Sequence, residues 1–221
     1  LIMGELYLLN KNVEKAVHTY QQALEINKKI PQIYAALARL YSKQGENKKV
    51  IAIYKQGLVE IPDNIRISIY LASAYEQAKE YKSAVDIYES LLTIAPRLEI
   101  AINNYASLLT DVYGDKQSLE KARTLLVRFG HSENPFYLDS FAWVELKLGN
   151  VTDALPLLEK VNTMADFAVF KYHLAVAYHE HGNNAAATAQ LRQAIDLGKK
   201  KGGFSDIERA QNLLDKLSIT G

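Results

Sequence analysis

Segments of this chain align with one another at a constant spacing of 34 residues. In three copies a large apolar residue is followed by a small residue and then by a tyrosine: Met3-Gly4-Tyr7, Leu37-Ala38-Tyr41 and Leu71-Ala72-Tyr75. Further along each copy a small or short residue precedes a tyrosine by four positions: Ala16 and Tyr20, Val50 and Tyr54, Ala84 and Tyr88. A fixed period of this size indicates stacked supersecondary units that share a continuous core. It directs the search for function toward an extended surface.

Composition excludes several classes of protein. Hydrophobic residues make up 48% of the 221 residues, so the chain can bury a core and is not disordered. The net charge of +1 gives no reason to expect nucleic acid as the main partner. Because cysteine is absent, disulfides, thiolate metal sites and cysteine nucleophiles are excluded. No apolar run reaches the roughly 18 residues of a membrane helix, so we expect no direct membrane insertion of this segment.

Each copy predicts a pair of helices. In the copy that opens at Pro31, apolar residues recur at helical spacing, which predicts a first helix: Tyr34, Leu37, Ala38 and Tyr41. Gly45 suits the left-handed turn that ends this helix. A second helix carries Val50, Tyr54 and Gly57, and Pro62 stops it.

This pattern resembles the tetratricopeptide repeat, which has large apolar residues at positions 4, 11 and 24, small residues at 8, 20 and 27, and proline at 32. The small residues allow neighbouring helices to approach closely enough to interdigitate. The resemblance covers essentially the whole chain. It implies an all-α fold, a right-handed superhelix (α-solenoid) of antiparallel helix pairs whose first helices line the concave face.

The repeat pattern divides the chain into one continuous array. The expected units are a truncated repeat at 1–30, full repeats at 31–64, 65–98, 99–134, 135–167 and 168–203, and a capping helix at 204–221. In the repeat at 99–134 we expect an enlarged inter-helix loop at 113–118, and in the next repeat Glu145 replaces the usual aromatic residue. Ser205 and Glu208 fit a capping box for the last helix. The chain opens within a helix pattern, so we expect a fragment of a longer protein.

The concave-face positions of the family supply the candidate partner-binding residues. Ten of the 14 tyrosines occupy packing positions of the repeat, whereas Tyr70 and Tyr172 do not. The resemblance implies contacts from Arg39, Arg66, Tyr70, Ser73, Asn103, Asn104, Ser107, Asp139, Trp143, Tyr172 and His173. We expect a peptide or protein segment to lie along residues 103–172, where polar groups can bond a peptide backbone and Trp143 and Tyr172 supply apolar area. The alternative is that Trp143 packs against neighbouring helices.

Other chemistries find little support in the sequence. One subclass of the family grips a C-terminal carboxylate through a lysine and an asparagine, and this chain has Ala35 and Arg39 at those positions. His173, His179 and His181 are not spaced to place metal ligands on one helical face. No nucleotide-binding or hydrolase motif occurs. We therefore expect no catalytic residues, no metal and no cofactor.

Three functional hypotheses follow. The first is a non-enzymatic scaffold that binds a partner protein or an extended peptide on its concave face. The second is a bacterial envelope assembly or export accessory, because segments such as Asn103-Asn104-Tyr105-Ala106 and Leu148-Gly149-Asn150 resemble PEP-CTERM/exosortase-associated TPR lipoproteins. The third is the targeting arm of a larger enzyme. The compartment stays open between bacterial cytoplasm and envelope. The apolar residues of the first repeat, including Leu6 and Leu9, predict self-association.

Overall fold

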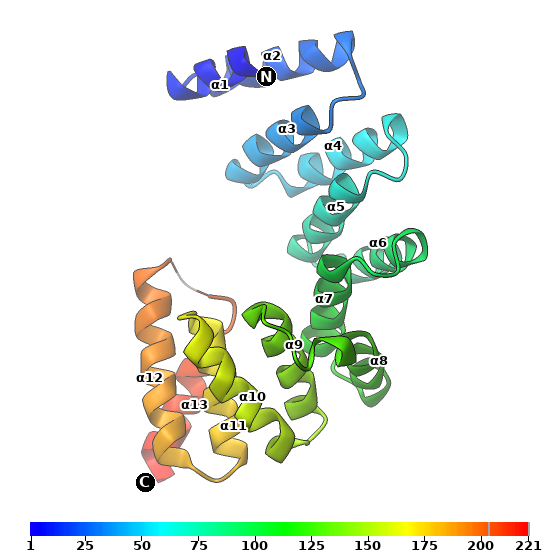
Figure 1. The fold of residues 1–221 in the computed structure, drawn as a ribbon. Coiled ribbons are helices and arrows are strands. Elements are labelled where there is room, and N and C mark those ends of the chain that lie inside the picture. Colours follow the sequence, from blue (N-terminus) through cyan, green and yellow to red (C-terminus); the bar gives the residue numbers. More distant parts are fainter. Residues whose placement is uncertain (203, 221) are drawn as a thin grey trace. The chain divides into compact units, whose positions relative to one another are not determined.

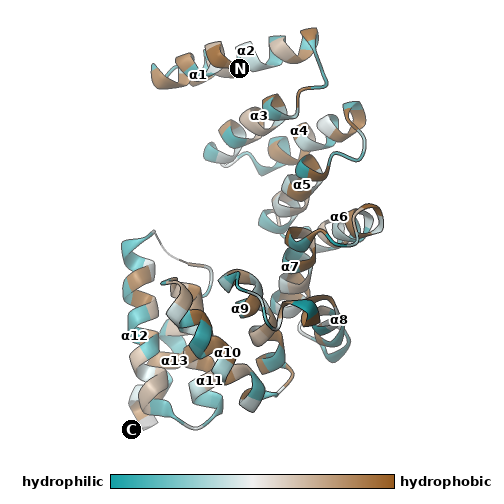
Figure 2. Cartoon of the chain, in the orientation of Figure 1, coloured by the Kyte–Doolittle hydropathy of each residue, from teal (hydrophilic) through white to brown (hydrophobic). Residues whose placement is uncertain are grey.

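The protein is an array of α-helices joined by short turns (Figure 1), seen in a computed structural model that describes residues 1–202 and 204–220. The α-helices of the described residues are α1 (Ile2–Leu9), α2 (Val13–Ile26), α3 (Pro31–Lys43), α4 (Asn47–Glu60), α5 (Ile65–Gln77), α6 (Tyr81–Ile94), α7 (Glu99–Leu108), α8 (Lys116–Leu126), α9 (Pro135–Lys147), α10 (Val151–Met164), α11 (Ala168–Glu180), α12 (Asn184–Lys200) and α13 (Ile207–Thr220). The described residues contain no β-strand. Apolar and hydrophilic residues alternate along most helices (Figure 2), as expected of helices that bury one side.

The chain divides into two compact units, Leu1–Ile102 and Asn103–Gly221, with the division inside α7. We describe each unit by itself. In both units successive helices form pairs, and each pair packs on the next. Among the helices described, none combines the length and apolar content that a bilayer crossing requires.

The first unit consists of three helix pairs, α1–α2, α3–α4 and α5–α6, with the start of α7. Its core contains the fully buried rings of Tyr20 and Tyr34, packed among aliphatic side chains. Gly57 of α4 lies where a larger residue would not fit without a shift of its neighbours, because a Cβ there would lie 3.1 Å from Tyr34 and from Ile67 of α5. Close approach of α3, α4 and α5 therefore depends on this position, as the repeat pattern predicts.

The turn inside each helix pair uses one residue in the left-handed conformation. That residue is a glycine at Gly45, Gly149 and Gly182, with φ of 73°, 87° and 87°. Lys11 and Lys79 occupy the equivalent turns with φ of 57° and 61°. Because a side chain is disfavoured there, the packing of the two helices holds these lysines in a strained conformation.

The second unit continues with α8 to α13, and its first turn corrects one expectation. Residues 113–118 do not form an enlarged loop. Instead the helix is extended by a π-helical turn, η1 (Leu109–Tyr113), closed by a hydrogen bond of 3.0 Å from Gly114 N to Leu109 O. Gly114 then turns the chain with φ of 64°, and Asp115 caps α8 by accepting from the backbone of Gln117 and Ser118. The extra residues are thus absorbed into helix.

Glu145, which stands where the repeat pattern has an aromatic residue, is buried in this unit. Its Oε1 accepts from Arg123 Nε at 2.6 Å, and its Oε2 accepts from Asn150 Nδ2 at 2.6 Å. Both carboxylate oxygens therefore have donors, which is what a buried carboxylate requires. The ion pair connects α8 to α9 where an aromatic ring would otherwise pack.

The last helix, α13, packs on α12 and covers the end of the core. The expected capping box of Ser205 and Glu208 is wrong, because α13 begins at Ile207 and leaves Asp206 ahead of its first turn. The Asp206 carboxylate accepts from Ser205 Oγ at 2.9 Å and from an Arg209 Nη at 2.8 Å. Phe204 lies over Gly198 of α12, where a Cβ would meet its ring at 2.7 Å.

Candidate functional site

Three of the predicted partner-binding residues line one recess of the first unit, of about 490 Å³. We call it the α1–α3–α5 groove, because Leu1 and Glu5 come from the α1 end, Arg39 from α3, and Arg66 and Tyr70 from α5. A smaller adjoining recess of about 180 Å³ adds the predicted residue Ser73. The first helices of successive pairs thus bring together all four residues that the sequence proposed for this unit.

Helical spacing explains how α5 presents its share of the groove. Arg66, Tyr70 and Ser73 are separated by four and three residues, so they lie on one helix face. The Tyr70 side chain is 40% exposed. Its ring lies 5.7 Å from that of Tyr54, which is buried behind it. The groove therefore has an exposed aromatic ring supported by a fixed one.

The charges of the α1–α3–α5 groove are largely unpaired. Arg39 and Arg66 are exposed, and neither forms an ion pair within the part of the chain that the structure describes. Burial, with a smaller contribution from Tyr70, raises the pKa of Tyr54 to about 12, so its hydroxyl stays protonated. Glu5 is the acidic side chain of the lining. Two guanidinium groups facing a groove favour an anionic or carboxylate-bearing ligand.

A buried hydroxyl lies within the field of the same charges. Tyr20 Oη is buried and has no hydrogen-bond partner. Burial raises its pKa first and the charge of Glu5 raises it further, whereas the charge of Arg39 lowers it. The hydroxyl is therefore close to two residues of the groove lining.

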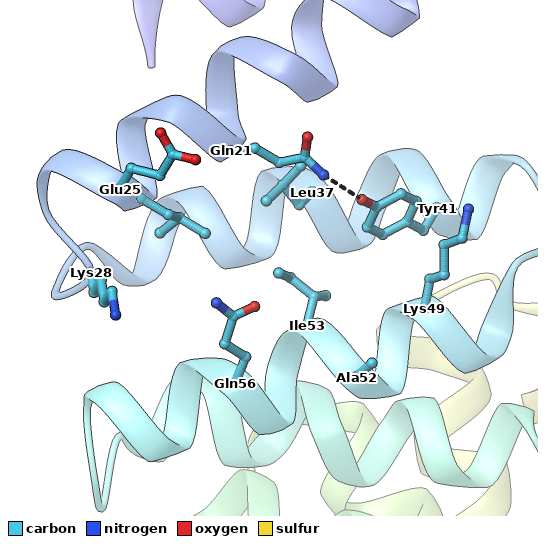
Figure 3. A pocket seen from close by; sticks show the side chains of 10 residues that line it. Gln21, Glu25, Lys28, Leu37, Tyr41, Lys49, Ala52, Ile53 and Gln56 are labelled. Atoms are coloured by element: carbon cyan, nitrogen blue, oxygen red, sulfur yellow. Dashed lines mark hydrogen bonds between the residues drawn. The ribbon is translucent and has the colours of Figure 1, made fainter.

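A second groove of about 470 Å³ runs between α2 and α4 over α3 (Figure 3). Gln21 on α2 donates to Tyr41 Oη at 3.4 Å, and Gln56 projects from α4 on the opposite wall. Its two lysines already have carboxylate partners, Lys28 with Glu60 and Lys49 with Glu46. This groove was not predicted from the sequence, because the candidate residues were taken only from first-helix positions.

In the second unit the structure buries four residues that the sequence analysis expected to be exposed: Asp139, Trp143, Tyr172 and His173. Trp143 is 4% exposed, and its ring stacks on that of His173 with centroids 3.9 Å apart. His173 Nδ1 lies 2.9 Å from Asp139 Oδ2. The prediction of exposed aromatic anchors is wrong, and the alternative that Trp143 packs against neighbouring helices holds, because its ring stacks on His173 of α11 and its Nε1 donates to Asp111 of η1.

The remaining predicted residues, Asn103, Asn104 and Ser107, lie on α7 and are half-buried. The Oδ1 atom of Asn103 is buried without a hydrogen-bond partner. Whether they contact a partner stays a prediction.

The pKa of the buried His173 depends on the acidic side chains around it. Burial is the largest single influence and lowers the pKa of His173, but the charge and the hydrogen bond of Asp139, together with the charges of Asp111 and Asp206, outweigh it, so the pKa is raised. Asp139 Oδ1 is buried without a partner. Trp143 Nε1 donates to Asp111 Oδ1 at 2.8 Å. The surrounding protein partly desolvates the Asp111 carboxylate, which raises its pKa. Polar contacts therefore join η1, α9 and α11.

Beside this cluster the second unit has a recess of about 260 Å³, which we call the η1–α9–α13 recess. It is lined by Asp111 of η1, Lys147 of α9, Tyr172 of α11 and Arg209 of α13. Of these residues only Tyr172 was predicted from the sequence, because Asp111 is placed by the π-helical turn and Arg209 by the packing of a distant helix. In the described residues no group of three or more metal-ligating side chains occurs.

The stacked helix pairs and the grooves they leave define an α-helical repeat protein. The chain belongs to the tetratricopeptide repeat family: family models described as "TPR repeat" and "Tetratricopeptide repeat" match residues 4–45, 33–65, 71–101 and 140–201. The expectation of an all-α fold of stacked tetratricopeptide helix pairs is confirmed.

Individual proteins show the same relationship. The chain is 27% identical over 132 residues to the human intraflagellar transport protein 88 homolog, covering 55% of this chain and 15% of that protein. It is 27% identical over 192 residues to the mitochondrial import receptor subunit TOM70 of Saccharomyces cerevisiae, covering 82% and 28%. The chain thus spans less than a third of the length of these relatives. A tetratricopeptide repeat protein from Parabacteroides merdae has a similar structure, with 19% identity, a TM-score of 0.68 and coverage of 98% and 81%.

Proposed function

We propose that this chain is a protein-interaction scaffold, without a reaction of its own, that holds an extended segment of a partner protein in the α1–α3–α5 groove. The observation that carries the proposal is the pair of unpaired guanidinium groups, Arg39 and Arg66, which line the same groove as the exposed Tyr70 ring. The similarity to an import receptor subunit supports a role in binding proteins.

The lining of the groove defines the chemistry of the partner segment. Arginine donates in a planar fork that matches a carboxylate, and tyrosine offers a large apolar area at low entropic cost. We therefore propose a segment with one or two acidic side chains close to a large apolar residue. Glu5 discriminates against a segment that is acidic throughout, because like charges repel.

The proposal is tested with peptides selected by phage display on the purified chain and measured by fluorescence anisotropy. Tyr70→Ala is expected to weaken binding about tenfold or more, because exposed aromatic residues in grooves act as anchors. Arg39→Ala and Arg66→Ala are expected to weaken it by a few fold each, and added salt by a similar factor, because the pairs are solvent-exposed. Lys82→Ala, on an exposed position of α6, is the control.

Circular dichroism establishes that each variant keeps the helical content of the wild type. If the selected peptides bind the three groove variants as tightly as they bind the wild type, the α1–α3–α5 groove is not the binding surface. The roles in a bacterial envelope or as the arm of an enzyme stay predictions, tested by the sequence of the full-length protein.

A further inference from the structure

The η1–α9–α13 recess of the second unit has charges of both signs that do not pair with each other. Asp111 and Lys147 both line the recess, and the charge of Lys147 acts on the pKa of Asp111. Even so, they form no ion pair. We propose that this recess binds a free α-amino acid, with the ligand ammonium on Asp111 and the ligand carboxylate on Lys147 and Arg209.

Asp111 is prepared to receive a cation. Trp143 Nε1 donates to its Oδ1 at 2.8 Å and fixes the orientation of the carboxylate. Within the part of the chain that the structure describes, this carboxylate forms no ion pair. Partial desolvation by the surrounding protein raises its pKa. An approaching ammonium group stabilises such a carboxylate, because it supplies the opposite charge that the carboxylate lacks.

The donors on the other side are also held in place. Lys147 Nζ lies 4.5 Å from the centroid of the Trp143 ring, a cation–π contact that keeps the ammonium near the recess. One Nη of Arg209 donates to Asp206 Oδ1 at 2.8 Å, which leaves other N–H groups of the guanidinium for a ligand. Because Trp143 orders both Asp111 and Lys147, little side-chain freedom is lost when a ligand binds.

Size and charge together select the class of ligand. The volume of about 260 Å³ lies below the usual range of drug-sized sites, so the ligand is small. A simple anion would leave Asp111 unpaired and would be repelled by it, and a simple cation would meet Lys147 in the same way. An α-amino acid carries both charges on one carbon and satisfies both sides. Leu119 and the Tyr172 ring provide an apolar wall for its side chain.

The site is independent of the proposed partner groove, because all its residues belong to the second unit. The experiment uses the full chain and the twenty L-amino acids, each at about 10 mM, with melting temperature and calorimetric titration as the readouts. We expect at least one amino acid to bind and to raise the melting temperature. Its deaminated carboxylic acid and its decarboxylated amine are expected to bind at least about tenfold more weakly, because each lacks one charge-assisted contact.

Variants assign the binding to the recess. Asp111→Asn and Lys147→Met are each expected to weaken binding about tenfold or more, and Arg209→Gln to weaken it less, because Arg209 is also paired with Asp206. Lys160→Met, which removes an exposed lysine of the same unit, is the control and should bind as the wild type does. Variants of Arg39 and Arg66 should leave amino-acid binding unchanged, so the two sites are tested separately.

Three results would overturn the proposal. The first is the absence of binding by every amino acid at about 10 mM, since an ordered site of this kind should be partly filled at that concentration. The second is equal binding of the carboxylic acid or of the amine alone, which would make the recess a plain anion or cation site. The third is unchanged affinity in both Asp111→Asn and Lys147→Met.

Discussion

Replacement of Trp143 by alanine tests whether this residue belongs to the core of the second unit or to a binding surface. The indole is 4% exposed, stacks on His173, donates to Asp111 and lies under the ammonium of Lys147. Truncation to alanine leaves a cavity between α9 and α11 that neighbouring side chains fill only in part. The variant should therefore lose stability whether or not a partner is present.

The expected magnitude follows from these contacts. Truncation of a buried tryptophan to alanine costs about 3–5 kcal/mol. Loss of the indole N–H adds little, because Asp111 is exposed and water can replace the donor. Trp143→Phe keeps a ring beside His173 and should cost about 1–2 kcal/mol. With a urea dependence of about 2 kcal/mol per molar, the alanine variant should unfold at a urea concentration about 2 M lower.

The assay is urea unfolding of the second unit, monitored by far-UV circular dichroism, because Trp143 is the single tryptophan of the chain. In the wild type, tryptophan fluorescence reports on the second unit and identifies its transition. A midpoint of Trp143→Ala within about 0.5 M of the wild-type value, at an unchanged slope, would refute the packing argument. A partner-binding experiment with this variant is informative only after its fold has been measured.

Four further predictions concern single positions. Lys79→Gly should stabilise the first unit by about 0.5 kcal/mol in urea unfolding, because relief of the left-handed lysine outweighs the entropy of glycine, and a loss of stability would contradict this. Gly4→Ala should cost about 1–3 kcal/mol, since its Cβ would lie 2.4 Å from the buried Tyr20 ring, and a neutral result would contradict the packing of α1. The raised pKa of His173 contributes stability that is fully present below its ordinary pKa of 6.5 and is lost as the pH rises through the folded-state pKa. The free energy of unfolding in urea should therefore differ less between about pH 6 and pH 9 in His173→Gln than in the wild type. Ile2, 76% exposed on α1, should support self-association in sedimentation experiments that Ile2→Glu abolishes, whereas a wild type that stays monomeric would remove the idea.

The sequence was a good guide to the repeat and to one of the two candidate surfaces. The helices α3, α5, α9 and α11 begin at Pro31, Ile65, Pro135 and Ala168, the residues that open the expected repeats. The sequence predicts these helix starts because the signals are local: a proline, small residues and the spacing of apolar residues within one or two helices. Arg39, Arg66, Tyr70 and Ser73 likewise meet in the groove region of the first unit.

The candidate residues on the first helices of the second unit behave differently, and the sequence does not indicate this. Tyr70 is exposed on α5, whereas Trp143 and Tyr172 are buried on α9 and α11. The same helix face is turned toward solvent in one unit and toward a neighbouring helix in the other. The capping helix α13 contributes as well, since Phe204 ahead of it lies 6.2 Å from the Tyr172 ring.

The sequence alone thus determined that this protein is a stack of helix pairs, because the 34-residue period, its small residues and its turn residues are local signals. Only the tertiary structure decided which polar and aromatic side chains reach solvent. The exposure of a side chain depends on the distance to the neighbouring helix and on the side chains that lie between the two helices. The π-helical turn, which places Asp111 beside Trp143, is an example. Glu145 is a second example, because its burial requires Arg123 of the preceding helix as a donor in addition to the nearby Asn150.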